Sequence, residues 1–186
     1  MRTDNIIYLT DYVSGDHTQR VGIILNELDE IGNTCQTPED VNQYVHTFPT
    51  DASAEMTNCR NLIYGLYQNA PTLGQLIYAA TLVSQINLEV FYCRERAILA
   101  HVILASIGIP SIIVVANDEL GRRHAFVKYW HKSVAKILDP EQRFLPTSYD
   151  PDAYHGYIYN VNIKELVRPN HILEGYERPQ MGINNQ

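Results

Sequence analysis

Residues 93–142, CRERAILAHVILASIGIPSIIVVANDELGRRHAFVKYWHKSVAKILDPEQ, decide the fold of this chain. Apolar residues follow helical spacing from Cys93 to Ile107, and Gly108 and Pro110 then give the signals that end a helix. β-branched and aromatic runs separated by turn residues come next. These runs are 111–116, 123–130 and 134–138. The stretch therefore predicts one helix followed by the strands of an antiparallel sheet.

Residues 1–84 predict a mostly helical N-terminal region. Apolar residues repeat at helical spacing in successive segments. Thr37 before Pro38, with acidic residues following, indicates a helix start, and Gly32 indicates a helix end. The stripes are Val21, Ile24, Leu25, Leu28 and Ile31; Val41, Tyr44, Val45 and Phe48; Met56, Cys59, Ile63 and Leu66; and Leu73, Leu76, Ile77, Ala80 and Val83.

The length of 186 residues predicts a single domain. Within it we distinguish a helical N-terminal region at residues 1–84, a catalytic core at 85–165 and a tail at 166–186. The core would begin with an extended segment at 85–92 and gain a further strand at 154–161. The predicted class is α+β, with the helical N-terminal half packed on the antiparallel sheet.

Composition excludes several classes of partner. Hydrophobic residues make up 45% and charged residues 19%, which is typical of a folded globule. The net charge of −7 makes nucleic acids and anionic membranes poor partners. The N-terminus lacks the pattern of a signal peptide, so we expect synthesis and folding in a cytoplasm.

Two alternative interpretations of the sequence are less favoured. Residues 97–116 carry no charged side chain and are long enough to span a membrane, but Gly108 and Pro110 divide them, which favours a helix and then a strand. The three cysteines are odd in number and widely spaced, which indicates neither a disulfide framework nor a zinc site. We expect no metal or organic cofactor.

Cys93 is a candidate nucleophile because it lies at the start of the predicted helix. Unbonded backbone N–H groups and the positive end of the helix dipole favour a thiolate there. The alternative is simple packing, which we favour for Cys59. A thiolate also needs a base, and His101 is excluded because eight residues along a helix span about 12 Å.

His124 and Asp139 are placed to supply a base and the acid that orients it. The midpoint between them falls between His131 and Lys132, where we expect the hairpin turn. A turn centred there places both residues directly opposite each other, on the same face of the sheet. A slip of one residue would move one partner to the other face. Cys93, His124 and Asp139 thus form a candidate triad.

The same residues resemble a known family. CRERAILAHVILASIGIPSIIVV, RRHAFVKYW and ILDPEQ, in this order, resemble the transglutaminase-like core of the papain-like superfamily over residues 92–142. A Cys-x-x-Arg-Ala start, a His that opens a strand and an Asp-Pro that closes the next are similar to the bacterial protein-glutaminase type. The matching positions are Cys93, Arg96, Ala97, His124, Asp139 and Pro140. Phe126 stands where transglutaminases commonly have Trp.

The resemblance implies roles for these residues. Cys93 would attack a glutamine carboxamide, His124 would protonate the leaving ammonia, and Asp139 would hold His124. For the oxyanion we expect the backbone N–H of Cys93, with Asn87 or Gln85 as side-chain donors. Arg96 would support the site structurally, the alternative being that Arg94, Glu95 and Arg96 are solvated charges of the first helical turn.

The predicted function is deamidation of glutamine in a protein or peptide substrate. Transglutaminase and cysteine peptidase chemistry are rivals, because all three share the acyl-enzyme step. A binding module that kept the papain-like fold without chemistry is an alternative of another class. Small size and protein-modifying chemistry also suggest, by analogy, a bacterial effector exported into another cell without a cleavable signal.

Overall fold

The structure is a computed structural model, and it describes residues 6–14, 17–24, 34–48, 54–84, 91–117 and 123–139. In chain order its elements are β1 (Ile6–Ser14), β2 (His17–Ile24), α2 (Pro38–His46), α3 (Ala54–Leu66), α4 (Leu73–Ser84), α5 (Cys93–Ser106), β3 (Ser111–Asn117), β4 (Arg123–His131) and β5 (Val134–Leu138). The strands form a two-stranded sheet, β1-β2, and a three-stranded sheet, β3-β4-β5. Helices together with this antiparallel three-stranded sheet agree with the predicted α+β class.

The hairpin of β1 and β2 corrects the prediction of a mostly helical N-terminal region. Val21 pairs with Leu9, and Ile24 pairs with Ile6. The apolar run at 21–24 fits the spacing of a helix and that of a strand, but its β-branched residues favour a strand. Ile23, which the predicted helical stripe omits, is fully buried. The remaining members of that stripe, Leu25, Leu28 and Ile31, lie outside the described residues.

The helix α2 agrees with its predicted cap, and the described stripe residues of α2 and α4 are buried or half-buried as predicted. The Thr37 side chain accepts a hydrogen bond from the Asp40 backbone N–H, and the Asp40 carboxylate accepts one from the Thr37 N–H, so a capping box starts α2. At α4, Thr72 accepts from the Gln75 N–H. The buried stripe residues include Val41, Val45, Leu73, Leu76 and Ala80.

The predicted inward face of α3 is wrong at Leu66, which is 68% exposed, and it omits Arg60 and Tyr64, which are buried. Ile63, which was also predicted to face inward, does pack against the main core. Hydrophobicity alone misplaces this face because its buried side chains are polar groups that find partners on another helix. Another predicted member, Ile63, is half-buried, and the side chains of Met56 and Cys59 lie outside the described residues.

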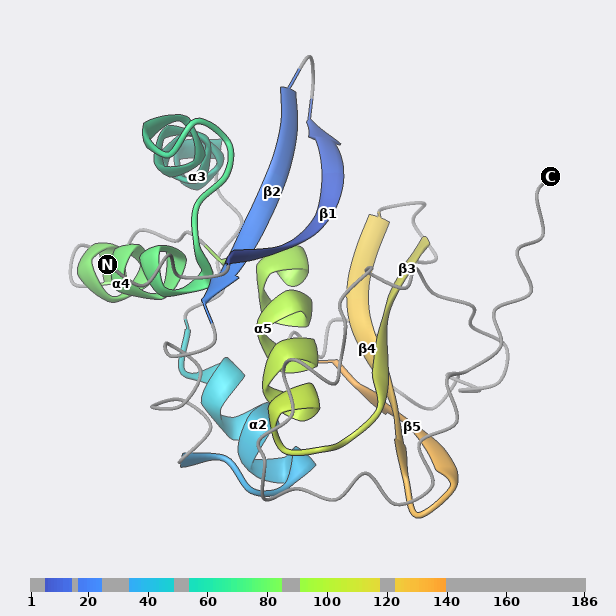
Figure 1. The fold of residues 1–186 in the computed structure, drawn as a ribbon. Helices are drawn as coiled ribbons and strands as arrows, with labels where there is room; N and C mark the ends of the chain where they lie inside the picture. Colours follow the sequence, from blue (N-terminus) through green and yellow to red (C-terminus); the bar gives the residue numbers. More distant parts are fainter. Residues whose placement is uncertain are drawn as a thin grey trace, which may run out of the picture.

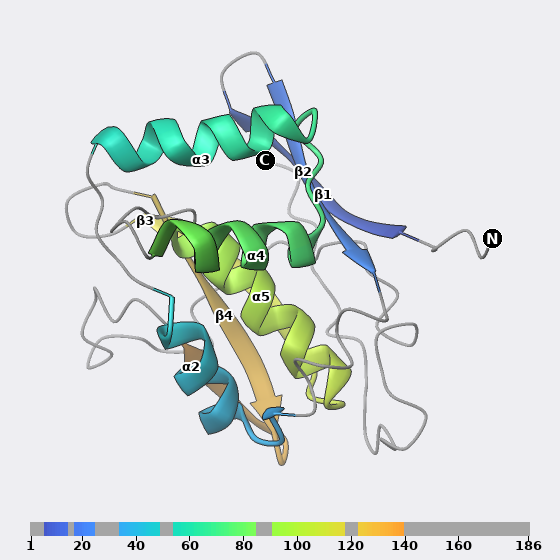
Figure 2. The ribbon, with the colours of Figure 1, turned by 90° about the vertical axis from the view of Figure 1, so that its left-hand side faces the viewer.

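The helix α5 lies at the centre of the fold. Figures 1 and 2 show it between the sheet of β3 and β4 on one side and α2 and α4 on the other. Every residue from Glu95 to Ser106 is buried, so the predicted single apolar face is in fact a core helix covered all round. Gly108, with a φ of 80°, ends it as predicted. Among the described residues, no helix is long and apolar enough to cross a membrane.

The three-stranded sheet places its two faces in different surroundings. Ala125, Val127 and Tyr129 of β4 belong to the main core with α5. Phe126, on the opposite face, packs with Ile112 and Val114 of β3. The strand limits match the predicted ones to within one residue. The predicted strand at 154–161 and the tail at 166–186 lie outside the stretches of chain that the structure describes.

Candidate active site

Cys93 is the first residue of α5, as predicted. Tyr92 before it has an extended backbone and serves as the N-cap. The first backbone N–H groups of a helix have no partner within the helix, and the Cys93 N–H is one of these groups. Cys93 is half-buried and packs against the edge of the main core.

His124 and Asp139 meet beside the end of the sheet. His124 is the second residue of β4, and Asp139 directly follows β5. The imidazole Nε2–H of His124 donates to Asp139 Oδ2 at 2.9 Å. The side chains are 5% and 8% exposed, respectively, so the hydrogen bond is shielded from water. A carboxylate in this place fixes the ring orientation and stabilises the imidazolium form.

The predicted direct opposition of His124 and Asp139 is wrong by two residues. His131 pairs with Val134, so the turn is centred between Lys132 and Ser133. Both turn residues have positive φ, as in a type I′ turn, although neither is the Gly or Asn that usually marks one. Continuing this register places Asp139 opposite Phe126, and a shift of two residues keeps His124 on the same face. The contact is therefore diagonal.

Cys93 lies near enough to His124 to act on the charge of its imidazole, so this ring has the thiol on one side and the carboxylate on the other. Burial lowers the pKa of His124, but the interactions with Asp139 and Cys93 outweigh this and raise the pKa to about 9. Because Nε2 is held by Asp139, Nδ1 is the nitrogen available to Cys93. At neutral pH this arrangement favours an imidazolium between two acceptors.

Arg96 is buried and acts from inside the core. Its Nη2 donates to the backbone carbonyl of Phe48 at 2.8 Å, which ties the first turn of α5 to the segment after α2. This contact agrees with the structural support expected of Arg96, and burial of Arg96 contradicts the alternative of a solvated charge. The two proposed side-chain oxyanion donors, Gln85 and Asn87, lie outside the described residues.

The excluded histidine, His101, is fully buried within α5. Its Nδ1 forms a hydrogen bond with the hydroxyl of Ser111 at 2.8 Å. Burial lowers the pKa of His101 to about 4, so the ring is neutral at neutral pH. His101 thus joins α5 to β3 and takes no part in the contact between Cys93 and His124.

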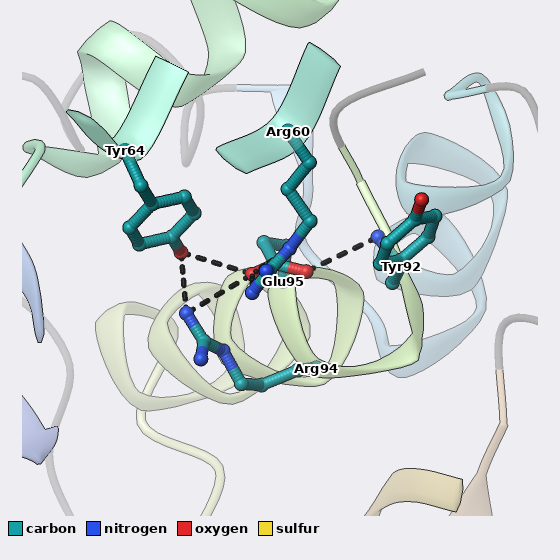
Figure 3. A network of polar contacts seen from close by, with 5 residues as sticks. All are labelled: Arg60, Tyr64, Tyr92, Arg94 and Glu95. Carbon is teal, nitrogen blue, oxygen red and sulfur yellow. Dashed lines mark hydrogen bonds and ion pairs between the residues drawn. The ribbon is translucent and has the colours of Figure 1, made fainter. Parts of the chain in front are cut away.

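A buried ionic cluster on the other side of the Cys93 turn was missed from the sequence. Figure 3 shows the carboxylate of Glu95 surrounded by Arg60 and Tyr64 of α3 and by Arg94 and Tyr92. Glu95 is 1% exposed and the Arg94 side chain 11% exposed, so neither is a solvated charge. The signal in the sequence was the polar pair Arg60 and Tyr64, four residues apart on one helical face.

Metal binding has no support among the described residues. Within them, no group of three or more His, Cys, Asp or Glu side chains could hold a metal ion. Cys35 and Cys93 are both thiols.

Comparisons with known proteins give one structural likeness. No family model matches the chain, and no curated protein matches it either. A solved structure titled "Crystal structure of a TGase" is similar to it, with 18% sequence identity and a TM-score of 0.40. The likeness covers 68% of this chain and 32% of that chain, so it spans about a third of the other protein. A likeness at this level establishes neither activity nor substrate.

Proposed function

We propose that this protein is a glutamine deamidase that uses Cys93, His124 and Asp139 in a thioester mechanism. The observation that carries the proposal is the single imidazole of His124, which contacts both the Cys93 sulfur and the Asp139 carboxylate. A ring that lies between a thiol and a buried carboxylate, supplied by separate elements, is the arrangement that nucleophilic catalysis requires. The choice of a glutamine carboxamide rests on the resemblance of residues 92–142 to protein-glutaminases.

In the first half-reaction the Cys93 thiolate attacks the carboxamide carbon. The oxygen takes up the negative charge, and the Cys93 backbone N–H at the start of α5 can donate to it. The tetrahedral intermediate collapses when the C–N bond breaks and the His124 imidazolium gives its proton to the leaving nitrogen. The products of this step are ammonia and a thioester between Cys93 and the substrate.

In the second half-reaction water hydrolyses the thioester. His124, now neutral, removes a proton from the water molecule as it attacks the thioester carbon. The C–S bond then breaks, the substrate leaves as glutamate, and Cys93 and His124 return to the thiolate and imidazolium forms. Asp139 keeps Nε2 protonated in both halves, so Nδ1 is the nitrogen that exchanges the proton.

The test is incubation of purified protein with a glutamine-containing peptide, with and without a primary amine. Ammonia release and product mass are measured for the wild type, Cys93→Ala and Cys35→Ala. The proposal predicts ammonia and a product in which a carboxyl replaces the carboxamide, with loss of activity by about 10³-fold or more in Cys93→Ala. Cys35→Ala should keep the rate, because the proposed mechanism gives no role to Cys35, which is buried in the main core.

Other products would identify the rival functions. Amine incorporation that depends on Cys93 would mean transglutaminase chemistry, and peptide fragments would mean a cysteine peptidase. Equal ammonia release by the wild type and Cys93→Ala would contradict the role of Cys93. If no Cys93-dependent product forms with any peptide or unfolded protein substrate, the deamidase proposal fails in favour of a binding module.

A further inference from the structure

The first turn of α5 is held from the side opposite to Cys93. Residues two apart on a helix point in nearly opposite directions, so Cys93 and Glu95 do not share a face. Cys93 contacts His124 of β4, whereas Glu95 contacts Arg60 and Tyr64 of α3. Figure 3 shows this second side of the turn.

The Glu95 carboxylate joins α3 to the backbone that leads into Cys93. Its Oε1 accepts from Arg60 Nη2 at 2.6 Å, from Arg60 Nε at 3.0 Å and from the Tyr64 hydroxyl at 2.9 Å. Its Oε2 accepts from the backbone N–H of Tyr92 at 3.2 Å. Tyr92 directly precedes Cys93, so α3 fixes the position of the chain where the proposed nucleophile and its N–H lie.

The cluster also sets the charge beside Cys93. A buried Glu95 carboxylate alone would repel a thiolate two residues away. Arg60 and Arg94 both lie against this carboxylate, Arg94 at 3.1 Å, and together the three groups carry one net positive charge. Burial raises the pKa of Glu95, but Arg94 and Arg60 outweigh this and lower the pKa to about 2, so the carboxylate is ionised at neutral pH.

In the part of α3 whose side chains the structure describes, residues 60–66, the fully buried side chains carry polar groups. From Arg60 to Leu66, the buried side chains are Arg60 and Tyr64. Leu62 and Leu66, which an ordinary helix would turn inward, are 64% and 68% exposed. The orientation of α3 thus buries a guanidinium and a phenol and exposes two leucines. This orientation is favourable because the buried polar groups find their partner in Glu95.

We propose that Arg60 is a positioning residue for Cys93, which holds the first turn of α5 through Glu95 and offsets the negative charge of Glu95 next to the thiolate. This inference rests on the proposed function, because it takes Cys93 to react as a thiolate. Arg60 acts through Glu95 and not by contact with a substrate. The direction in which a change at Arg60 alters the reactivity of Cys93 should therefore follow from the change in charge.

Among the described residues, the other charged groups of the two clusters beside Cys93 stay constant in the test. They are His124 of β4, Asp139 directly after β5, and Arg94 and Arg96 of α5. The sequences of α4 and β3 contain no charged residue. In α2 the charged residues, Glu39, Asp40 and His46, lie in the first and last turns.

The test measures alkylation of Cys93 by iodoacetamide across a pH series. Mass spectrometry of the Cys93 peptide separates this thiol from Cys35 and Cys59. The variants are Arg60→Gln, Glu95→Gln and the double variant. Arg60→Gln should slow alkylation about 3- to 10-fold at neutral pH and move the profile to higher pH, because it leaves the negative charge of Glu95 less balanced.

Glu95→Gln should have the opposite effect, faster alkylation with a profile at lower pH, and the double variant should return close to the wild type. Tyr64→Phe keeps every charge, so its profile should stay in place. A merely structural role would instead move Arg60→Gln and Glu95→Gln in the same direction, and that result, or unchanged profiles in both, overturns the proposal.

The positioning role can be tested even if one variant does not fold or the protein is not a deamidase. If Arg60→Gln does not fold, the comparison of Glu95→Gln with the double variant still gives the sign of the Arg60 effect. Failure of the deamidase proposal is seen separately, as absence of Cys93-dependent ammonia release, because alkylation needs no substrate. Opposite shifts without ammonia release would support the positioning role and contradict only the reaction.

Discussion

Two buried polar clusters flank the first turn of α5, and they differ in what their protons can do. On one side Glu95 accepts hydrogen bonds from Arg60, Tyr64 and the Tyr92 backbone, and its pKa of about 2 keeps it ionised. On the other side His124 lies between Asp139 and Cys93, and its pKa of about 9 lies within reach of neutral pH. The first cluster holds charge in place, and the second can exchange a proton.

The difference between the clusters explains why similar polar groups can have different roles. The described groups that donate hydrogen bonds to Glu95 are an arginine, a buried tyrosine and a backbone amide. None of these groups loses its proton easily. The imidazole of His124 titrates far more readily, and its partner Cys93 is only half-buried. We infer that the first cluster supports structure and that the second carries the proposed chemistry.

The largest expected effect separates the two clusters by activity. Asp139→Asn should lower kcat about 10³-fold, because the amide no longer stabilises the imidazolium and can favour the wrong tautomer of His124. The rate of ammonia release is the measurement. Asp40→Asn is the matched control, since Asp40 belongs to the capping box of α2, and its rate should equal that of the wild type. Similar rates for Asp139→Asn and the wild type would remove the distinction between the clusters.

The next effect concerns stability. Glu95→Ala should lower the free energy of unfolding by about 3–5 kcal/mol, because it leaves Arg60 and Arg94 buried without their carboxylate. Denaturant unfolding gives this value. Glu39→Ala, on the exposed side of α2, is the control and should change it by less than about 0.5 kcal/mol. A small loss in Glu95→Ala would mean that the cluster does not hold α3.

The two clusters should lose their contributions to stability at opposite ends of the pH range. Glu95 has a lowered pKa, so its contribution is present above its usual value of 4.5 and is lost as the pH falls toward about 2. His124 has a raised pKa, so its contribution is present below 6.5 and is lost as the pH rises through about 9. Thermal unfolding across the pH range should show both losses. Glu95→Gln should reduce only the acidic one.

The smallest effect tests how α3 is held. Leu66→Ala should change the free energy of unfolding by less than about 0.5 kcal/mol, because the side chain is 68% exposed. Leu76→Ala in α4 removes a fully buried leucine and should cost about 2–5 kcal/mol. Denaturant unfolding of both variants gives the comparison. If Leu66→Ala lowered the free energy of unfolding as much as Leu76→Ala does, Leu66 would have to make an apolar contact.

Much of the fold could be predicted where local signals agreed. Thr37 and Pro38 mark the start of α2, and Gly108 marks the end of α5. The hairpin at 6–24 could not be predicted in this way, because its apolar residues also fit a helix and the choice depends on pairing with a distant strand. The inward face of α3 could not be predicted for a related reason, since the partner of the buried Arg60 is Glu95, which lies 35 residues away in the sequence.

The geometry of the candidate site could be predicted only in part. The sequence pointed to Cys93, His124 and Asp139 as a triad, and the structure places His124 against Asp139 and near Cys93. The turn at Lys132 and Ser133 carries no Gly or Asn, so its position could not be located from residue types. The predicted pairing of His124 with Asp139 differs from the observed register by two residues, so both residues stay on the same face of the sheet. Their side chains are long enough to meet across the diagonal between the two strands.

The most direct test of the central claim, that His124 is shared between Cys93 and Asp139, is an NMR titration of histidine-labelled protein. His124→Asn assigns the signal, and His101, with its pKa lowered to about 4, serves as an internal reference. We expect a midpoint near 9 for His124 in the wild type and a lower midpoint in Cys93→Ala. A midpoint near the ordinary value of 6.5 in both proteins would contradict the claim.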